Sequence, residues 1–149
     1  MPRPELFLDS SVLFAGVVSP DGAARVLLLL AEVGLVTVTV CEQVVAETER
    51  AVARMVPQAL PYYREALRST GLRIVRDPSP EEVEAHQDII AHQADVPIVV
   101  AATRADVDYL VTLNHQHFID DSDVAVRLGL RICAPGDALA RVQEKWRQQ

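Results

Sequence analysis

The fold is decided by the stretch ADVPIVVAATRADVDYLVTL, residues 94–113. Residues 96–104 have almost no polar face, which predicts a helix buried on nearly all sides. Residues 109–113 are rich in the β-branched and aromatic side chains that are typical of a strand. Asp95 directly precedes the apolar segment. We therefore expect a buried helix that begins at Asp95 and leads into a strand.

Strands and helices alternate along the rest of the chain. The expected strands cover residues 5–8, 35–41, 72–75, 109–113 and 130–133. The expected helices cover residues 23–33, 42–55, 60–69, a short segment after the capping Ser79, 96–104, 123–128 and 136–147. This alternation predicts a parallel sheet that is covered by helices on both faces.

Composition indicates one globular domain, residues 1–149. Half of the 149 residues are apolar and 23% are charged, which is atypical of disorder. Cys41 and Cys133 are isolated in the sequence, and residues 26–41 fall short of the roughly 20 apolar residues of a membrane span. We therefore expect a reduced, cytoplasmic protein with no membrane segment. The net charge of −7 excludes a wholly basic nucleic-acid-binding surface.

Phosphate-binding and nucleophile motifs are absent from the sequence. It contains no GxxxxGK[ST], no GxGxxG after the first expected strand, and no GxSxG. What remains is a set of polar side chains near strand ends and helix starts: Asp9, Glu47, Asp95 and Asn114. Ligands of open α/β sheets bind at the carboxyl ends of the strands, and oxygen ligands suit Mg²⁺ or Mn²⁺. Such a site is suited to metal-dependent phosphodiester hydrolysis.

Each of these acids also has a purely structural interpretation. Asp9 could merely begin a turn, and Asp95 could be no more than the N-cap of the helix that follows it. Glu47 could pair with Arg50 on a solvated helix face. A further group of acids is more typical of loop and capping positions: Asp120, Asp121 and Asp123. Spacing alone therefore supports a metal site only weakly.

Four blocks of sequence together resemble the PIN domain, the nuclease fold of many toxin–antitoxin toxins. They are LFLDSSVLFAG (6–16), TVCEQVVAETERAV (39–52), ADVPIVVAATRADVDYLVTLNHQHF (94–118) and LGLRICAPGDAL (128–139). The resemblance implies a three-layer α/β/α fold around a mostly parallel sheet of about five strands. It also implies cleavage of RNA that depends on Mg²⁺ or Mn²⁺. By resemblance, Asp9, Glu47 and Asp95 match the family's three principal acids.

Two positions depart from the family pattern. Asn114 stands where many members carry a fourth acid. The resemblance therefore assigns Asn114 the role of a secondary metal ligand, and the site has one negative charge fewer. Asp120 or Asp121 is a possible substitute. Ser11 stands where the family often has asparagine, and the hydroxyl of Ser10 or Ser11 is expected to bind the scissile phosphate. The expected roles are metal ligation and catalysis for Asp9, Glu47, Asp95 and Asn114.

Additional side chains are candidates for contact with RNA. Arg50 and Arg54 lie one helical turn apart, as do Arg64 and Arg68, and ion pairing with neighbouring glutamates is the alternative. Three residues near the end of the fourth expected strand complete the candidate substrate site: Thr112, His115 and His117.

Two functions follow as hypotheses. The first is a metal-dependent ribonuclease that acts as the toxin of a toxin–antitoxin pair. The second is a catalytically weak relative that binds RNA or a protein partner without efficient cleavage, as the uncharged Asn114 suggests. The family resemblance also implies a homodimer and an antitoxin protein as partners.

Overall fold

Five strands form one parallel sheet in the computed structural model, which describes residues 3–88, 93–114 and 129–148. Their order across the sheet is β3-β2-β1-β4-β5, so the first strand of the chain is the central one. The strands are β1 (Glu5–Leu8), β2 (Thr37–Cys41), β3 (Arg73–Val75), β4 (Tyr109–Val111) and β5 (Ile132–Cys133). The predicted α/β class and parallel sheet are confirmed.

The central strand β1 is the best-buried element of the sheet. Leu6, Phe7 and Leu8 are each 0% exposed. Phe7 lies opposite Thr39 of β2 on one side and Leu110 of β4 on the other. Because all pairs are parallel, the carboxyl ends of β2, β1 and β4 meet at one edge of the sheet. That edge is where Asp9 lies.

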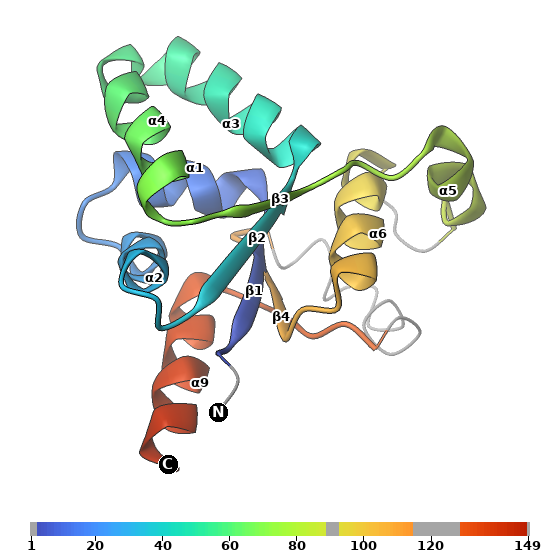
Figure 1. Ribbon diagram of the computed structural model, residues 1–149. Helices are drawn as coiled ribbons and strands as arrows, with labels where there is room; N and C mark the ends of the chain where they lie inside the picture. Colours follow the sequence, from blue (N-terminus) through green and yellow to red (C-terminus); the bar gives the residue numbers. More distant parts are fainter. Residues whose placement is uncertain (1–2, 89–92, 115–128, 149) are drawn as a thin grey trace.

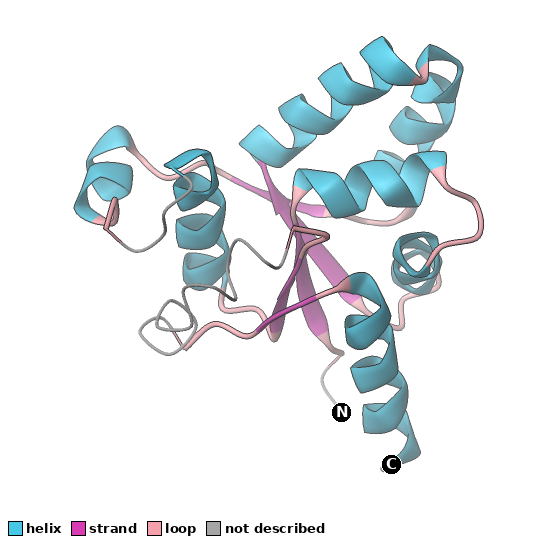
Figure 2. Cartoon of the chain, turned by 180° about the vertical axis from the view of Figure 1, so that it is seen from behind, coloured by secondary structure: helices cyan, strands magenta, loops and turns pink. Residues whose placement is uncertain are grey.

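Helices cover both faces of the sheet. In Figures 1 and 2, α1, α2 and α9 lie on one face, and α6 lies on the other, with α5 beside it. The helices are α1 (Ser10–Val18), α2 (Ala23–Glu32), α3 (Glu42–Met55), α4 (Leu60–Ser69), α5 (Pro80–Ala85), α6 (Val96–Ala105) and α9 (Pro135–Arg147). Two 3₁₀ turns lie at Pro57–Ala59 and Gln93–Asp95. The result is the expected three-layer arrangement.

The apolar helix that dominates the decisive stretch is buried as predicted. Six residues of α6 lie in the core: Val96, Ile98, Val99, Val100, Ala101 and Ala102. The helix ends at Asp106, whose left-handed backbone (φ 55°) turns the chain toward β4. Asp106 supports this turn because aspartate tolerates a positive φ better than most residues do.

The helix α1 is absent from the sequence-based prediction. This helix has four buried residues among its nine: Val12, Leu13, Gly16 and Val17. Apolar side chains lie on all sides of it, so it has no polar stripe. A helix without an amphipathic period gives no signal at 3.6 residues. The first expected strand matches β1, and the other four expected strands are slightly longer than the observed ones. The helix predicted over residues 123–128 lies outside the described residues.

The corner between α1 and α2 depends on a glycine. A Cβ atom added to Gly16 would lie 2.7 Å from Leu28 Cδ1 and 3.2 Å from the carbonyl oxygen of Ala24. The missing side chain therefore lets the two helices pack closely.

Within the described ranges, no single helix has the length and apolarity to span a membrane. The α1–α2 pair meets that test together, although it is bent by 88°.

We predict that Gly16→Val destabilises the protein by about 1 to 3 kcal/mol, because the added atoms overpack the α1–α2 contact. Thermal or urea unfolding measures the change. Gly136→Ala is the matched control, since no atom lies within 4 Å of its added Cβ. Equal stability of the Gly16→Val protein and the wild type would show that this contact is not tight.

Candidate functional site

Asp9 lies at the carboxyl end of β1 and caps the first turn of α1. Its side chain is 7% exposed, and its Oδ1 accepts hydrogen bonds from the Val12 backbone N–H (3.1 Å) and the Ser11 hydroxyl (2.6 Å). Its own backbone N–H donates to the carbonyl of Val111 at 3.2 Å. Asp9 is thus held by both the helix that follows it and the neighbouring strand β4.

Thr112 supports the other oxygen of the Asp9 carboxylate. This threonine directly follows β4, is 0% exposed, and donates its hydroxyl hydrogen to Asp9 Oδ2. The Thr112 hydroxyl in turn accepts the backbone N–H of Asn114 at 3.0 Å. The backbone N–H of Leu113 donates to the Ser11 hydroxyl at 3.2 Å. Both candidate substrate residues, Ser11 and Thr112, therefore bond to Asp9 in this structure.

Burial raises the pKa of Asp9 above its ordinary value, and the negative charge of Asp95 adds to that rise. Hydrogen bonds from Ser11, Thr112 and Val12 act in the opposite direction because they stabilise the carboxylate. Removal from water is the dominant cause. The structure therefore places Asp95 near enough for its charge to act on Asp9, as expected for side chains at one edge of the sheet.

Asp95 enters the site from the opposite layer, at the start of α6. It occupies the N-cap position, but its side chain makes no capping hydrogen bond to that helix. An aspartate whose only role was capping would accept a backbone N–H of the first turn. The structural alternative for Asp95 is therefore not supported by the cap geometry.

Glu47 is held in place by two neutral donors. Its Oε2 accepts the Ser10 hydroxyl at 2.9 Å, and its Oε1 accepts the side-chain amide of Gln43 at 2.7 Å. The same amide nitrogen donates to the carbonyl of Ala94 at 3.3 Å. No ion pair joins Glu47 to Arg50 among the described residues. The structural alternative for Glu47, an ion pair with Arg50 on a solvated face, is therefore not observed.

Gln43 is the residue that sequence reasoning missed. Its side chain links Glu47 of α3 to the backbone next to Asp95, so it connects two of the three acid-bearing segments. The available signal was its position four residues before Glu47, a spacing that places both side chains on one helix face. Glutamine is common on helix surfaces, so that spacing alone does not indicate a function.

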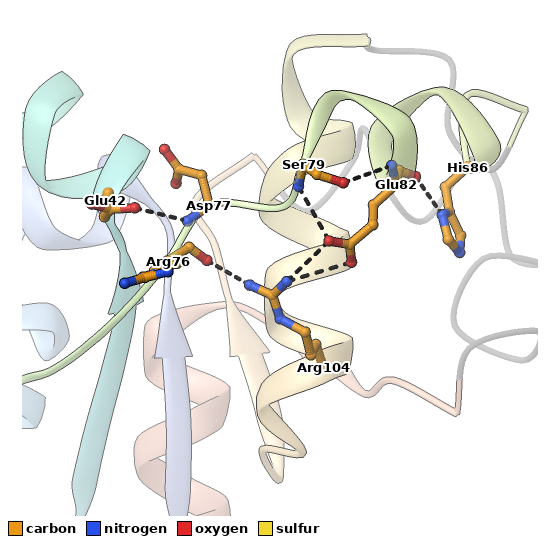
Figure 3. A network of polar contacts seen from close by, with 7 residues as sticks. All are labelled: Glu42, Arg76, Asp77, Ser79, Glu82, His86 and Arg104. Carbon is orange, nitrogen blue, oxygen red and sulfur yellow. Dashed lines mark hydrogen bonds and ion pairs between the residues drawn. The ribbon is translucent and has the colours of Figure 1, made fainter.

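A polar network beside the site anchors the start of α3 (Figure 3). Asp77, in the loop after β3, accepts the backbone N–H of Gln43 at 2.8 Å and donates its own N–H to Glu42 Oε1 at 3.1 Å. Arg104 of α6 donates to the carbonyl of Arg76 and contacts Glu82 at 3.4 Å. Ser79 and Glu82 form a capping box on α5. The network ties α3 to α6 next to Gln43.

The two predicted arginine pairs have different environments. Arg64 and Arg68 form ion pairs with glutamates at 3.6 Å and 2.8 Å, so the structural alternative holds for that pair. Arg50 and Arg54 make no ion pair with the described residues, and they line a groove of about 310 Å³ together with Glu47. Only Arg50 and Arg54 therefore adjoin the acidic site.

The remaining candidates cannot all be placed. Asn114 is exposed and lies two residues beyond Thr112. The other candidates lie outside the described residues: His115, His117, Asp120, Asp121 and Asp123. Within residues 3–88, 93–114 and 129–148, no three His, Cys, Asp or Glu side chains are grouped closely enough to form a ready-made metal site.

The chemistry of the donors nevertheless suits Mg²⁺ or Mn²⁺. Magnesium keeps several water ligands and is commonly bound by one or two carboxylates together with substrate phosphate oxygens. Asp9 and Asp95 supply two interacting carboxylates, and their mutual repulsion is the kind that a divalent cation relieves. A site with two carboxylates needs no preformed group of three acids.

The sequence matches the PIN domain over residues 5–116. That match covers most of the chain, so the protein belongs to the PIN-domain family, a family of nucleases. A search among curated proteins finds no match.

Solved structures share the fold at low sequence identity. PAE2754 from Pyrobaculum aerophilum has a TM-score of 0.67 at 17% identity, with 95% of this chain and 90% of that chain covered. VapBC2 from Rickettsia felis, bound to a DNA fragment from its promoter, has a TM-score of 0.60 at 18% identity, with 87% and 98% covered. VapC20 from Mycobacterium tuberculosis, a toxin that cleaves the sarcin–ricin loop, has a TM-score of 0.56 at 15% identity, with 77% and 94% covered.

We predict that Asp9→Asn stabilises the metal-free protein at neutral pH. The pKa of Asp9 is higher in the folded protein than in the unfolded chain. A protein with such a carboxyl group loses stability as the pH rises from the pKa of the unfolded chain through that of the folded protein. Asparagine does not ionise and keeps an oxygen acceptor for Val12 and Ser11. Melting temperatures of wild type and variant in EDTA, measured from about pH 4 to about pH 8, should therefore diverge as the pH increases.

The exposed Asp21 supplies the control Asp21→Asn, which removes the same charge from the surface. Its melting temperature should follow that of the wild type at every pH. An Asp9→Asn protein that is less stable than wild type at neutral pH would contradict the electrostatic account.

Proposed function

We propose that this protein is a divalent-metal-dependent endoribonuclease that hydrolyses RNA phosphodiester bonds, and that it acts in the cytoplasm as the toxin of a toxin–antitoxin pair. The observation that carries the proposal is the buried Asp9 carboxylate, whose pKa is raised by burial and by the charge of Asp95. Burying one acid within reach of the charge of another costs free energy, and such perturbed acids cluster at functional sites. The nuclease family of the chain gives that site its chemistry.

The acidic side chains divide the work of hydrolysis. Asp9 and Asp95 hold Mg²⁺ or Mn²⁺, with Asn114 as a secondary ligand. A bound divalent ion supplies an activated water and neutralises charge that develops on the phosphate. Glu47, the third expected ligand, orients the attacking water, and Ser10 and Gln43 fix its carboxylate for that role.

The substrate lies over the carboxyl edge of the sheet. Ser10 is placed to contact the scissile phosphate, since its hydroxyl is already part of the site. Arg50 and Arg54 line the adjoining groove and offer cations to the next phosphates of the strand. Ser11 and Thr112 act on the substrate through Asp9, to which both donate. His115 and His117 remain candidates for RNA contact.

The proposed partners are a second copy of this chain and an antitoxin. Two residues of α2 and its C-cap residue are exposed and apolar at helical spacing: Val26 (36% exposed), Leu29 (48%) and Val33 (69%). Leu35 (46% exposed) and Tyr62 (39%) are also exposed, and Arg25 stacks on the Tyr62 ring at 4.3 Å. A contiguous apolar stripe of this kind is typical of a protein–protein interface.

Asn114 gives specific support to a second function, a weakly catalytic domain that binds RNA or a protein partner. An amide at this exposed position contributes no charge to a site in which, among the described residues, Asp95 is the acid that acts on Asp9. The second function predicts slow cleavage by the natural protein and faster cleavage by the Asn114→Asp variant.

Cleavage of a mixed-sequence single-stranded RNA tests the proposal directly. Purified protein should cut the RNA with Mn²⁺ and not with EDTA, and Asp9→Asn and Asp95→Asn should each lower the rate by at least about a hundredfold, because each removes a charge on which the site depends. Asp106→Asn is the matched control, since this exposed aspartate lies between the end of α6 and the start of β4, at the amino end of the sheet, and asparagine also tolerates its positive φ.

Each result separates the candidates. Metal-dependent cleavage that is lost in both site variants and kept in the control supports the nuclease. Undiminished cleavage by either folded site variant contradicts the assignment. Absence of cleavage by the wild type together with cleavage by Asn114→Asp supports the weakly catalytic domain.

A further inference from the structure

A second cleft lies at the amino end of the sheet, opposite the acidic site. It has a volume of about 370 Å³ and lies between α9 and the first residues of β4 and β5. Tyr109, at the start of β4, lines this cleft, whereas Thr112, just past the end of the same strand, contacts Asp9. The two sites therefore lie at opposite ends of β4.

Three cations from two separate segments line this cleft. Arg131 directly precedes β5, and Arg141 and Lys145 lie one turn apart on α9. None of the three forms an ion pair with a carboxylate of the described residues. Four other arginines of the described surface do form such pairs, among them Arg68 and Arg104. The cleft thus gathers three cations that are not ion-paired with the described residues on a protein that is acidic as a whole.

An aromatic ring holds two of these cations in place. The Cζ atom of Arg141 lies 5.0 Å from the centroid of the Tyr109 ring, and that of Arg131 lies 6.0 Å from it. Cation–π contacts at these distances restrain both guanidinium groups near the ring. A restrained guanidinium offers N–H donors to a phosphate along its edge and a flat surface to a nucleobase on its face.

The charge and size of the cleft limit the ligand. Asp108 and Glu144 also line it, so three cations and two carboxylates leave one net positive charge. Asp108 is already engaged, since its Oδ2 accepts the backbone N–H of Glu5 at 2.7 Å. A single positive charge matches one phosphate better than a di- or triphosphate. A volume of about 370 Å³ is at the small end of the range for ligand pockets and suits one nucleotide.

We propose that this cleft binds one nucleoside monophosphate unit, with its phosphate on Arg141, Lys145 and Arg131 and its base against the Tyr109–arginine stack. The unit is either a free mononucleotide or one nucleotide of an RNA chain whose other part lies elsewhere on the protein. Only the RNA source rests on the proposed function, because binding of a free nucleotide requires neither the acidic site nor catalysis.

Calorimetric titration of the full chain in EDTA tests the proposal. The probes are 5′-AMP, inorganic phosphate and a short RNA, and the protein carries Asp9→Asn so that the RNA stays intact. The test variant adds Arg141→Gln and Lys145→Gln. The matched control instead adds Arg64→Gln and Arg68→Gln, which remove the same charge from the exposed helix α4. Circular dichroism checks that every variant is folded.

We expect the test variant to weaken AMP binding at least about tenfold while the control leaves it unchanged, because hydrogen bonds from charged donors to phosphate are lost only in the test variant. The same loss seen only with the short RNA supports the cleft and identifies RNA as the source of the nucleotide. Three results overturn the proposal. They are no binding of AMP or RNA, equal weakening by both variants, and inorganic phosphate binding as tightly as AMP.

These results are independent of catalysis. Suppose that cleavage requires Asp9 but that nucleotide binding is unchanged when Arg141 and Lys145 are replaced. This result would support the nuclease and contradict the second site. Nucleotide binding that requires Arg141 and Lys145, in a protein that does not cleave RNA, would support the second site and contradict the nuclease.

Discussion

The burial of one carboxylate at the end of the central strand is the constraint on which the site depends. Asp9 follows β1, which has hydrogen-bonded strands on both sides, so its side chain has little access to water. An ionised group in such a place needs donors from the protein. Val12, Ser11 and Thr112 supply them, and they come from the following helix and the neighbouring strand. The fold and the site are therefore coupled at this residue.

The other acids are tied to Asp9 by short links rather than by direct bonds. Ser10 follows Asp9 in sequence and donates to Glu47, and Gln43 connects Glu47 to the backbone beside Asp95. All these donors are neutral, so they position the acids without neutralising their charge. In the proposed function, the negative charge that these neutral donors leave in place is what would attract a divalent cation to this edge. Cations that form no ion pair with the described residues gather at the opposite end of the sheet, around Tyr109.

Much of the fold was predictable because the residues carry strong local signals. Residues 42–55 and 60–69 form the helices α3 and α4 over the predicted residues, since apolar side chains recur at helical spacing and Pro57 separates the two. The helix α1 has no amphipathic period, and, unlike the apolar helix α6, it has no proline in its first turn to mark its start. A helix that is apolar on all sides is buried without any amphipathic pattern in its sequence.

The site was predictable only in outline. Asp9 and Asp95 could be assigned to strand ends and helix starts from sequence, and the structure brings their charges together. The role of Gln43 depends on a contact with Ala94, 51 residues away, which no local pattern indicates. The difference between Arg50, which faces the groove, and Arg64, which pairs with Glu49, also depends on packing between helices.

The central claim is that Asp9 and Asp95 are held together in order to bind a divalent cation. Anomalous diffraction from crystals soaked in Mn²⁺ tests it most directly, because the signal locates the ion without reference to activity. The account predicts one manganese peak in contact with the carboxylates of both Asp9 and Asp95, absent from crystals of the Asp9→Asn protein. A peak elsewhere, or no peak while both carboxylates stay in place, would contradict it.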